Sequence, residues 1–259
     1  MVKRLNTGKG GWLLTAAVFL AMNAVSQGQS GVPMSPGSGA GMNSALLKLF
    51  GNNTAFTARA EMRVVDNKAK KETALMPMKF AMLDGKVRAD LDTTQIKSSE
   101  IPPEAIADMK KMGMDSVVTI QRPDKKISLL LYPSLQAWVE TPMSKDEIAD
   151  ATRNYKVEKT KVGRETVEGR ACDKNKVVLT SDLGQKVEAT VWNAPDLKDF
   201  PVKIQMTDPE NTIVFTFKEV KPGRPDPSQF EAPEKFTKYD NAQRLLMAAM
   251  ARVTNNAGK

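Results

Sequence analysis

The sequence predicts a mainly β (α+β) fold, a curved antiparallel half-barrel of about ten or eleven strands with short helices covering its concave face. Three observations lead to this fold class. Apolar and polar residues alternate with period 2 over most of the chain. Most segments between the alternating runs have two to five residues, which favours antiparallel neighbours. Helical segments are few, so a curved sheet must cover much of its own apolar face.

The N-terminus has the pattern of a secretory signal peptide at residues 1–26. Three basic residues and no acidic residue precede an apolar run at 12–25. As a helix this run is about 21 Å long, which is short of the roughly 30 Å that a bilayer core requires. Ala24 and Ser26 fit a cleavage site before Gln27. The pattern predicts a periplasmic or secreted protein, and an uncleaved N-terminal anchor is the alternative.

The rest of the chain divides into a linker, one domain and a tail. Gly, Ser and Pro dominate residues 27–42, which predicts a flexible linker. Residues 43–254 form the predicted half-barrel domain, whose length suits a single core. Residues 255–259 are predicted to be a disordered tail.

The first half of the domain begins with a short amphipathic helix at 44–50, which precedes the alternating segments. Strands are predicted at 56–64, 76–82 and 86–92, and Asp84-Gly85 is a strong hairpin signal between the last two. Two prolines open a helix at 102–112.

The second half continues with strands and two more helices. Strands are predicted at 116–121, 126–132, 135–140, 155–162, 174–180, 185–192, 201–207 and 212–220. A short helix is predicted at 143–152. The final helix is predicted to begin at a capping Asp240, with an apolar face of Leu245, Leu246, Ala249, Met250 and Val253.

The residue inventory argues against an enzyme. The chain has no His and one Cys, which removes Ser-His-Asp and Cys-His nucleophile pairs, His-based zinc sites and CxxC redox pairs. No phosphate-binding loop, nucleophile elbow or dinucleotide fingerprint occurs. We therefore expect no catalytic residue, no metal site and no cofactor.

Cys172, the single cysteine, has two interpretations. A thiol beside Arg170 could be reactive, but a small buried side chain on a strand is the favoured interpretation.

The charge of the chain is moderate. The net charge is +8, and removal of the three basic residues of the predicted signal peptide lowers it to +5. The lysines are scattered among acidic residues, which indicates a solvated surface. Nucleic-acid binding requires a clustered basic stripe with exposed aromatics, so no nucleic-acid partner is predicted. The charge is compatible with weak attraction to an anionic membrane surface.

Methionines are concentrated on the apolar faces of the early strands and of the 102–112 helix. Their flexible, polarizable side chains suit an adaptable apolar cavity, and an ordinary filled core is the alternative. The predicted ligand-binding residues of this cavity are Met62, Met76, Met78, Phe80, Met82, Ile106 and Met109. We expect the 76–82 face to look toward Ile106 and Met109.

Several short motifs from about Ser44 to Tyr239 occur in a characteristic order. They are Gly85-Lys86-Val87-Arg88, Leu131-Tyr132-Pro133, Trp138 with Glu140 and Pro142, residues 163–169 with Cys172, Trp192 before Asp196-Leu197 and Pro201, and Phe230 with Pro233. In this order the chain resembles an uncharacterised family of exported bacterial domains, which in turn looks like the lipoprotein carriers LolA and LolB.

This resemblance implies an open half-barrel whose concave side is plugged by helices and whose apolar cavity accepts acyl chains. It also implies that an arginine on an early strand holds the helical lid closed. By position, the lid-contact candidates are Arg59, Arg63 and Arg88.

The sequence is therefore compatible with two functions. The first is an exported non-catalytic binding protein, a periplasmic carrier or sensor for lipid or acylated ligands such as lipoproteins. The second is a protein–protein interaction module with a filled core and no small-molecule ligand. The expected partners are a lipid or acyl chain, and envelope proteins or a membrane surface.

Overall fold

The computed structural model describes residues 44–99 and 101–257. The predicted signal peptide and the predicted linker lie outside the described residues. In chain order the elements are α2 (Ser44–Lys48), β1 (Ala55–Asp66), β2 (Lys71–Leu83), β3 (Lys86–Asp92), η2 (Thr93–Gln95), β4 (Lys97–Ser98), α3 (Pro103–Lys111), β5 (Ser116–Arg122), β6 (Ile127–Tyr132), η3 (Pro133–Leu135), β7 (Ala137–Pro142), α4 (Lys145–Ala151), β8 (Tyr155–Val167), β9 (Arg170–Ser181), β10 (Lys186–Ala194), η4 (Pro195–Leu197), β11 (Phe200–Thr207), β12 (Asn211–Pro222), η5 (Pro227–Phe230), β13 (Thr237–Tyr239) and α5 (Ala242–Ala257).

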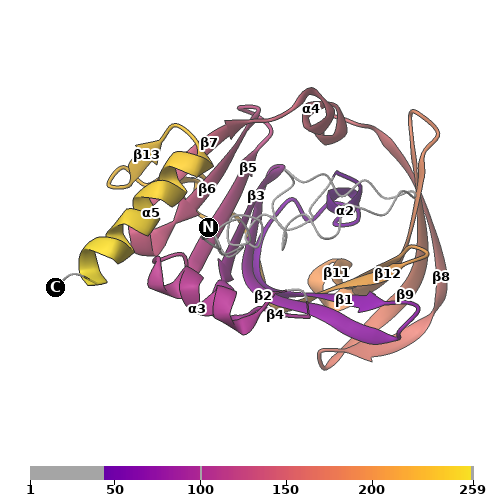
Figure 1. The fold of residues 1–259 in the computed structure, drawn as a ribbon. Helices are drawn as coiled ribbons and strands as arrows, with labels where there is room; N and C mark the ends of the chain where they lie inside the picture. The colour runs from indigo at the N-terminus through magenta and orange to yellow at the C-terminus, as the bar shows by residue number, and fades with distance from the viewer. Residues whose placement is uncertain (1–43, 100, 258–259) are drawn as a thin grey trace, which may run out of the picture.

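The strands form one strongly curved sheet that does not close (Figure 1). Its order is β13-β7-β6-β5-β3-β2-β1-β12-β11-β10-β9-β8, with β4 paired to β2. The mainly antiparallel half-barrel predicted from the sequence is confirmed. The sheet has 13 strands, more than the ten or eleven predicted, because the extra strands β4 and β13 have only two and three residues. Such short strands carry no measurable alternation.

The hairpin of β8 and β9 is longer than predicted. Both strands extend to a turn at Glu168 and Gly169, which have φ values of +48° and +75°. Residues 163–167 of β8 were missed because Gly163, Arg164 and Glu165 give this end of the strand no alternation of apolar and polar residues.

The concave face of the sheet, which carries Ala58, Met78 and Ala89, is packed against α2. Phe50 follows this helix and lies among aromatic rings from several strands. The ring centroid of Phe50 is 5.1 Å from that of Phe56 and 5.3 Å from that of Phe217. The largest apolar cluster of the described residues is built around these rings and joins β1–β3 to β9–β12. The helix α2 therefore fills this half of the concavity.

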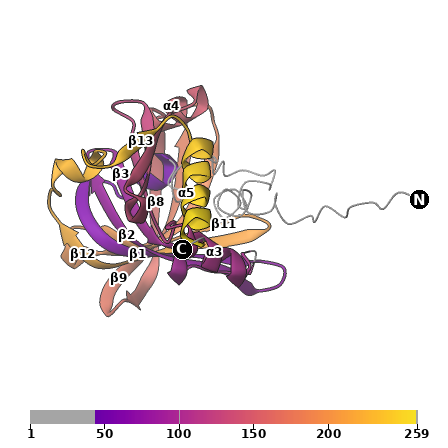
Figure 2. The ribbon, with the colours of Figure 1, turned by 60° about the vertical axis from the view of Figure 1, so that its left-hand side comes forward.

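The same face continues onto β5–β7, where α3 and α5 cover it (Figure 2). Leu245 and Ala249 of α5 pack against Ala137 and Val139 of β7. Met250, which was predicted on this packed face, is instead 49% exposed.

Both ends of α5 differ from the prediction. The side chain of Asn241, not that of Asp240, accepts the hydrogen bond from the backbone N–H of Arg244. Asp240 forms an ion pair with Arg244 instead. At its other end α5 continues to Ala257, so it includes the first three residues of the predicted disordered tail.

The convex face, which carries Arg59, Lys79 and Arg88, is partly covered by residues 222–236. Phe230 from this segment is fully buried in a third apolar cluster with Leu83, Ile120 and Leu131. Arg122 lies beside it and donates a hydrogen bond from Nη1 to the carbonyl oxygen of Phe230, at 3.1 Å. The Pro-rich segment is therefore a packed part of the domain.

Candidate functional site

A pocket of about 440 Å³ lies on the concave side, between α2, the hairpin of β2 and β3, the end of β5, and α4. This is where the chain crosses from β7, next to one edge strand of the sheet, to β8 at the other edge. The helix α4 lies on this crossing (Figure 1). The lining residues are Ser44, Leu47, Lys48, Gly51, Asn52, Thr54, Met82, Gly85, Gln121, Pro123, Met143, Glu147, Asp150 and Ala151.

The floor of this pocket combines apolar and amide groups. Met82 of β2 and Gln121 of β5 both line the pocket and are both buried. Gln121 lies directly opposite Ser128 of β6. The Ser128 hydroxyl is the one buried side-chain polar atom without a hydrogen-bond partner in the described part of the chain. A buried hydroxyl is normally satisfied, so an unpaired hydrogen-bonding group lies next to Gln121, although Ser128 does not itself line the pocket.

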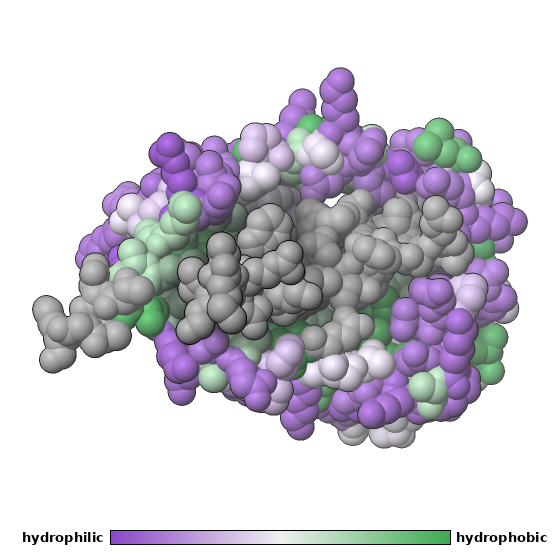
Figure 3. All heavy atoms as spheres, in the orientation of Figure 1, coloured by the Kyte–Doolittle hydropathy of each residue, from purple (hydrophilic) through white to green (hydrophobic). Residues whose placement is uncertain are grey.

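The helix α4, which borders the pocket, is stabilised by its own polar contacts. It begins with a capping box, in which Ser144 accepts from the backbone of Glu147 and Glu147 accepts from the backbone of Ser144. None of its residues is buried. Figure 3 shows mostly hydrophilic residues along the outline of the molecule in this view. A helix with so little apolar burial separates from its neighbours at a small free-energy cost.

Asp150 connects α4 to α2. Its Oδ2 atom accepts a hydrogen bond of 3.0 Å from the backbone N–H of Ser44, at the first residue of α2. The Ser44 hydroxyl also lies 3.4 Å from the hydroxyl of Tyr155. Arg153 contacts both Asp150 and Gln185. The two helices on either side of the pocket are therefore linked through one carboxylate.

The predicted cavity residues are placed in two separate clusters. Met62, Met76, Met78, Phe80 and Met82 are buried on the concave face and belong to the cluster around α2. Met109 belongs to the cluster that α3 forms with α5, and Ile106 is half-buried on α3. The expected contact of the 76–82 face with α3 is thus replaced by contact with α2. Of the seven predicted residues, Met82 lines the pocket.

The three arginines proposed to contact a lid lie on the convex face, on the other side of the sheet from α2. Arg59 forms an ion pair with Glu219, and Arg63 contacts Glu61 and Glu72. Arg88 makes a two-pronged contact with Asp90 and donates to the carbonyl oxygen of Gln229. These partners belong to strands and to the Pro-rich segment at residues 222–236. None of the three arginines therefore holds a helix on the concave side.

The pocket residues from α4 and α2 were not predicted as a site. The capping signal Ser144-x-x-Glu147 is present in the sequence and correctly indicates a helix start. That Asp150 of this helix contacts Ser44 of α2, 106 residues earlier in the chain, depends on the curvature of the whole sheet. No local pattern carries this information.

Within residues 44–99 and 101–257, no group of three or more Cys, Asp or Glu side chains is arranged to hold a metal ion. The helices in the same residues are too short or too polar to cross a membrane.

Cys172 is fully buried in the cluster around α2, which confirms its interpretation as a small core residue. Burial raises the pKa of its thiol. We expect the native protein to resist alkylation by a bulky maleimide until it unfolds, because the reactive thiolate is both inaccessible and disfavoured. Cys172→Ala should lower the free energy of unfolding by about 1 kcal/mol. Rapid labelling of the native protein would contradict this assignment.

Comparisons with known proteins found similar solved structures only at low sequence identity. No protein-family model matches the chain, and no curated protein matches it. Among solved structures, a LolA superfamily protein from Nitrosomonas europaea is 12% identical, with 73% of this chain and 98% of that chain covered and a TM-score of 0.35. LprF from Mycobacterium bovis is 12% identical, with coverages of 71% and 91% and a TM-score of 0.39. The lipoprotein LppX from Mycobacterium tuberculosis is 13% identical, with coverages of 70% and 97% and a TM-score of 0.39.

The first of these structures comes from the superfamily that the sequence motifs resemble. The identities and TM-scores are too low to carry an argument about function, so the site is interpreted from its own residues.

Proposed function

We propose that this protein is an exported, non-catalytic binding protein that carries or senses a lipid or acylated ligand. The apolar part of the ligand occupies the pocket between α2 and α4. The N-terminal pattern of basic residues, apolar run and small residues supports export to the periplasm or secretion.

The pocket beneath α4 is the observation that carries this proposal. Its volume of about 440 Å³ falls in the range of roughly 300–1,000 Å³ that is typical of small-molecule sites. Leu47 of α2, Met82 of β2 and Met143, which lies just before α4, supply the apolar lining. Gln121 adds an amide on the floor for the polar end of the ligand. Such a combination suits an acyl chain with a neighbouring ester or amide group.

Entry requires α4 to move away from α2. Because α4 buries no residue, this motion breaks mainly the hydrogen bond between Asp150 and the backbone of Ser44. The sheet and the aromatic cluster around Phe50 remain intact. Opening is therefore local and does not require unfolding of the core.

Filling the pocket should abolish binding of a fluorescent acyl probe. Ala151→Trp places an indole in the pocket, whereas Ala149→Trp places the same group on an exposed part of the same helix. We expect Ala151→Trp to weaken probe binding by about tenfold or more, because the indole takes the volume of the bound chain. Ala149→Trp should bind like the wild type. Equal binding by all three proteins would show that the probe binds elsewhere.

The second function, an interaction module without a small-molecule ligand, is favoured by a different observation. Much of the concavity is filled by α2 and by the five-ring cluster of Phe50, Phe56, Phe80, Phe200 and Phe217. Organic extraction of the purified protein followed by mass spectrometry discriminates the two functions. Absence of any co-purified lipid, together with no binding of the acyl probe by the wild type, would favour the interaction module.

A further inference from the structure

A second hollow, of about 300 Å³, lies on the convex face and therefore on the opposite side of the sheet from α2. Its walls come from β1, β2, β3, the end of β12 and the Pro-rich segment at Gln229. Four cationic and two anionic side chains line it: Arg59, Lys79, Arg88, Lys221, Asp90 and Glu219.

The hollow forms where two small side chains on adjacent strands lie between two long ones. Ala81 of β2 lies opposite both Arg88 of β3 and Thr57 of β1. Thr57 in turn lies opposite Lys221 of β12. The two small residues Ala81 and Thr57 leave a trough, and a long cationic side chain stands at each end of it.

The next row of the sheet adds further positive charge. In the part of the chain that the structure describes, this charge is compensated at Lys218 by Glu61 and Glu168 but not at Lys79. Arg59 lies directly opposite Lys79 on one side and Lys218 on the other. Like charges in direct cross-strand pairs are unfavourable. Glu219 compensates Arg59 through an ion pair of 3.1 Å. Among the described residues, Lys79 and Lys221 form no ion pair. The trough therefore carries more positive than negative charge.

Glu219 occupies an unusual backbone conformation. It has a φ of +49° at a register shift between β1 and β12, in the left-handed region that residues with a side chain rarely adopt. Residues held in such conformations cluster at ligand sites. The carboxylate of Glu219 is 60% exposed, so it is a weakly held counter-ion that an incoming anion can replace.

We propose that this trough binds a phosphate group, carried either by a soluble phosphate ester or by a lipid head group. The Arg59 side chain, 67% exposed, offers parallel N–H donors that match phosphate oxygens, and Lys79 and Lys221 add mobile ammonium groups. Arg88 is fixed by Asp90 and by the carbonyl oxygen of Gln229, so it forms one wall. This site does not depend on the pocket under α4.

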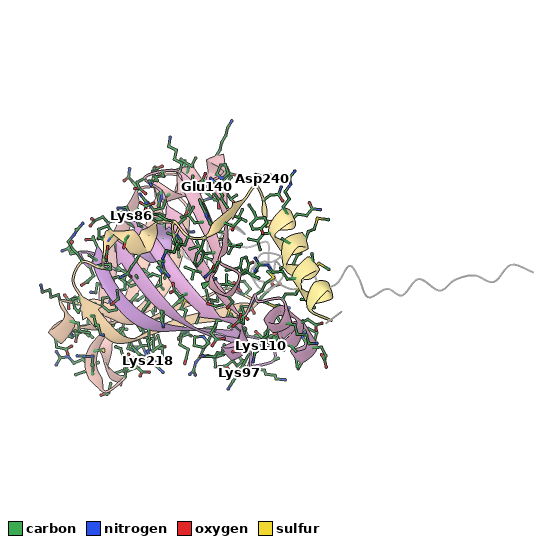
Figure 4. All side chains as sticks on the ribbon, turned by 90° about the vertical axis from the view of Figure 1, so that its left-hand side faces the viewer. Lys86, Lys97, Lys110, Glu140, Lys218 and Asp240 are labelled. Carbon is green, nitrogen blue, oxygen red and sulfur yellow. The ribbon has the colours of Figure 1, made fainter. Side chains whose placement is uncertain are left out.

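Titration of the purified protein with inorganic phosphate and with glycerol phosphate, followed by NMR, tests the site. The double variant Arg59→Gln/Lys79→Gln should weaken phosphate binding by about tenfold or more, since it removes two charge-assisted donors. Glu219→Gln should strengthen binding by about threefold, because the competing carboxylate is gone. Lys97→Gln is the control for loss of a positive charge outside the trough, since Lys97 is exposed on β4 and lies apart from Lys218 in Figure 4.

Co-sedimentation with vesicles that contain phosphatidylglycerol separates the two sources of phosphate. Vesicle binding that is lost in the double variant, with no binding of soluble phosphate, assigns the site to a lipid head group. Binding of soluble phosphate that is lost in the double variant assigns it to a phosphate ester. The proposal is overturned if neither probe binds the wild type, or if the double variant binds both probes as well as Lys97→Gln does.

Discussion

Phe50→Ala should lower the free energy of unfolding by about 3–5 kcal/mol, the usual cost of removing a buried aromatic side chain. Phe50 is 1% exposed, and its ring lies within 5.1 to 6.2 Å, between centroids, of four other phenylalanines. It joins α2 to the strands on both sides of the concavity. The sheet cannot collapse into the space because its strands are held by their neighbours, so a cavity remains. Urea denaturation followed by circular dichroism measures the change.

Leu47→Ala is the matched control on the same helix. Leu47 is half-buried and lines the pocket, so its truncation enlarges an existing space and should cost about 1 kcal/mol or less. If Phe50→Ala costs no more than Leu47→Ala, α2 is not part of the cooperative core. The half of the concavity between β1–β3 and β9–β12 would then be open, and the pocket under α4 would be one end of a larger site.

The strands of the sheet were predictable because burial of one face imposes a period of two residues. Residues such as Ala58, Ala60 and Met62 alternate with Thr57, Arg59 and Glu61, and the hairpin at Asp84-Gly85 fixes the register of β2 with β3. Where this cause is absent the prediction was incomplete. Residues 163–167 of β8 have no apolar alternation, and β13 gains its strand character only from a parallel partner, β7.

The candidate site was less predictable than the fold. The face that carries Met76, Met78 and Phe80 was correctly predicted as apolar, but the helix that covers it could not be chosen from the sequence. Both α2 and α3 have an apolar stripe, and the choice between them depends on how sharply the sheet curves. Curvature is a sum of twists over many strands, and no single residue encodes it.

The prediction for the three lid-contact arginines also used the wrong side of the sheet. Arg59, Arg63 and Arg88 alternate with inward-facing residues, so period 2 places all three on the convex face. The resemblance to the carriers had instead predicted that one of them contacts a helical lid on the concave face. The alternation is the more direct physical constraint, because a shift of one residue would expose the whole apolar face to water.

The convex face has its own structural anchor in Arg122. Its side chain is 6% exposed and makes two parallel hydrogen bonds to Asp124, of 2.9 and 2.8 Å. Its remaining Nη1 group donates to the carbonyl oxygen of Phe230 and to Glu231. One guanidinium thus fixes the segment that covers the third apolar cluster.

Arg122→Met should lower the free energy of unfolding by about 2–3 kcal/mol at neutral pH. The substitution keeps a long apolar side chain but removes several charge-assisted hydrogen bonds and leaves the Phe230 carbonyl unpaired. Arg224→Met is the matched control. Arg224 pairs with Asp84 on the same face but is 67% exposed, so its loss should change stability little.

The effect of Arg122→Met should also depend on pH, with a sign fixed by Asp124. The hydrogen bonds from Arg122 hold the pKa of the Asp124 carboxyl below its ordinary value. A carboxyl whose pKa is lower in the folded state stabilises the protein at pH values above its unfolded-state pKa of about 4. This stabilisation is lost as the pH falls through the folded-state pKa. The stability difference between wild type and Arg122→Met should therefore be largest at neutral pH and narrow below about pH 4.

Part of the difference, from the Phe230 carbonyl, should persist in acid. Denaturation curves at a series of pH values measure this, and a difference that widens on acidification would refute the role of the Arg122–Asp124 pair.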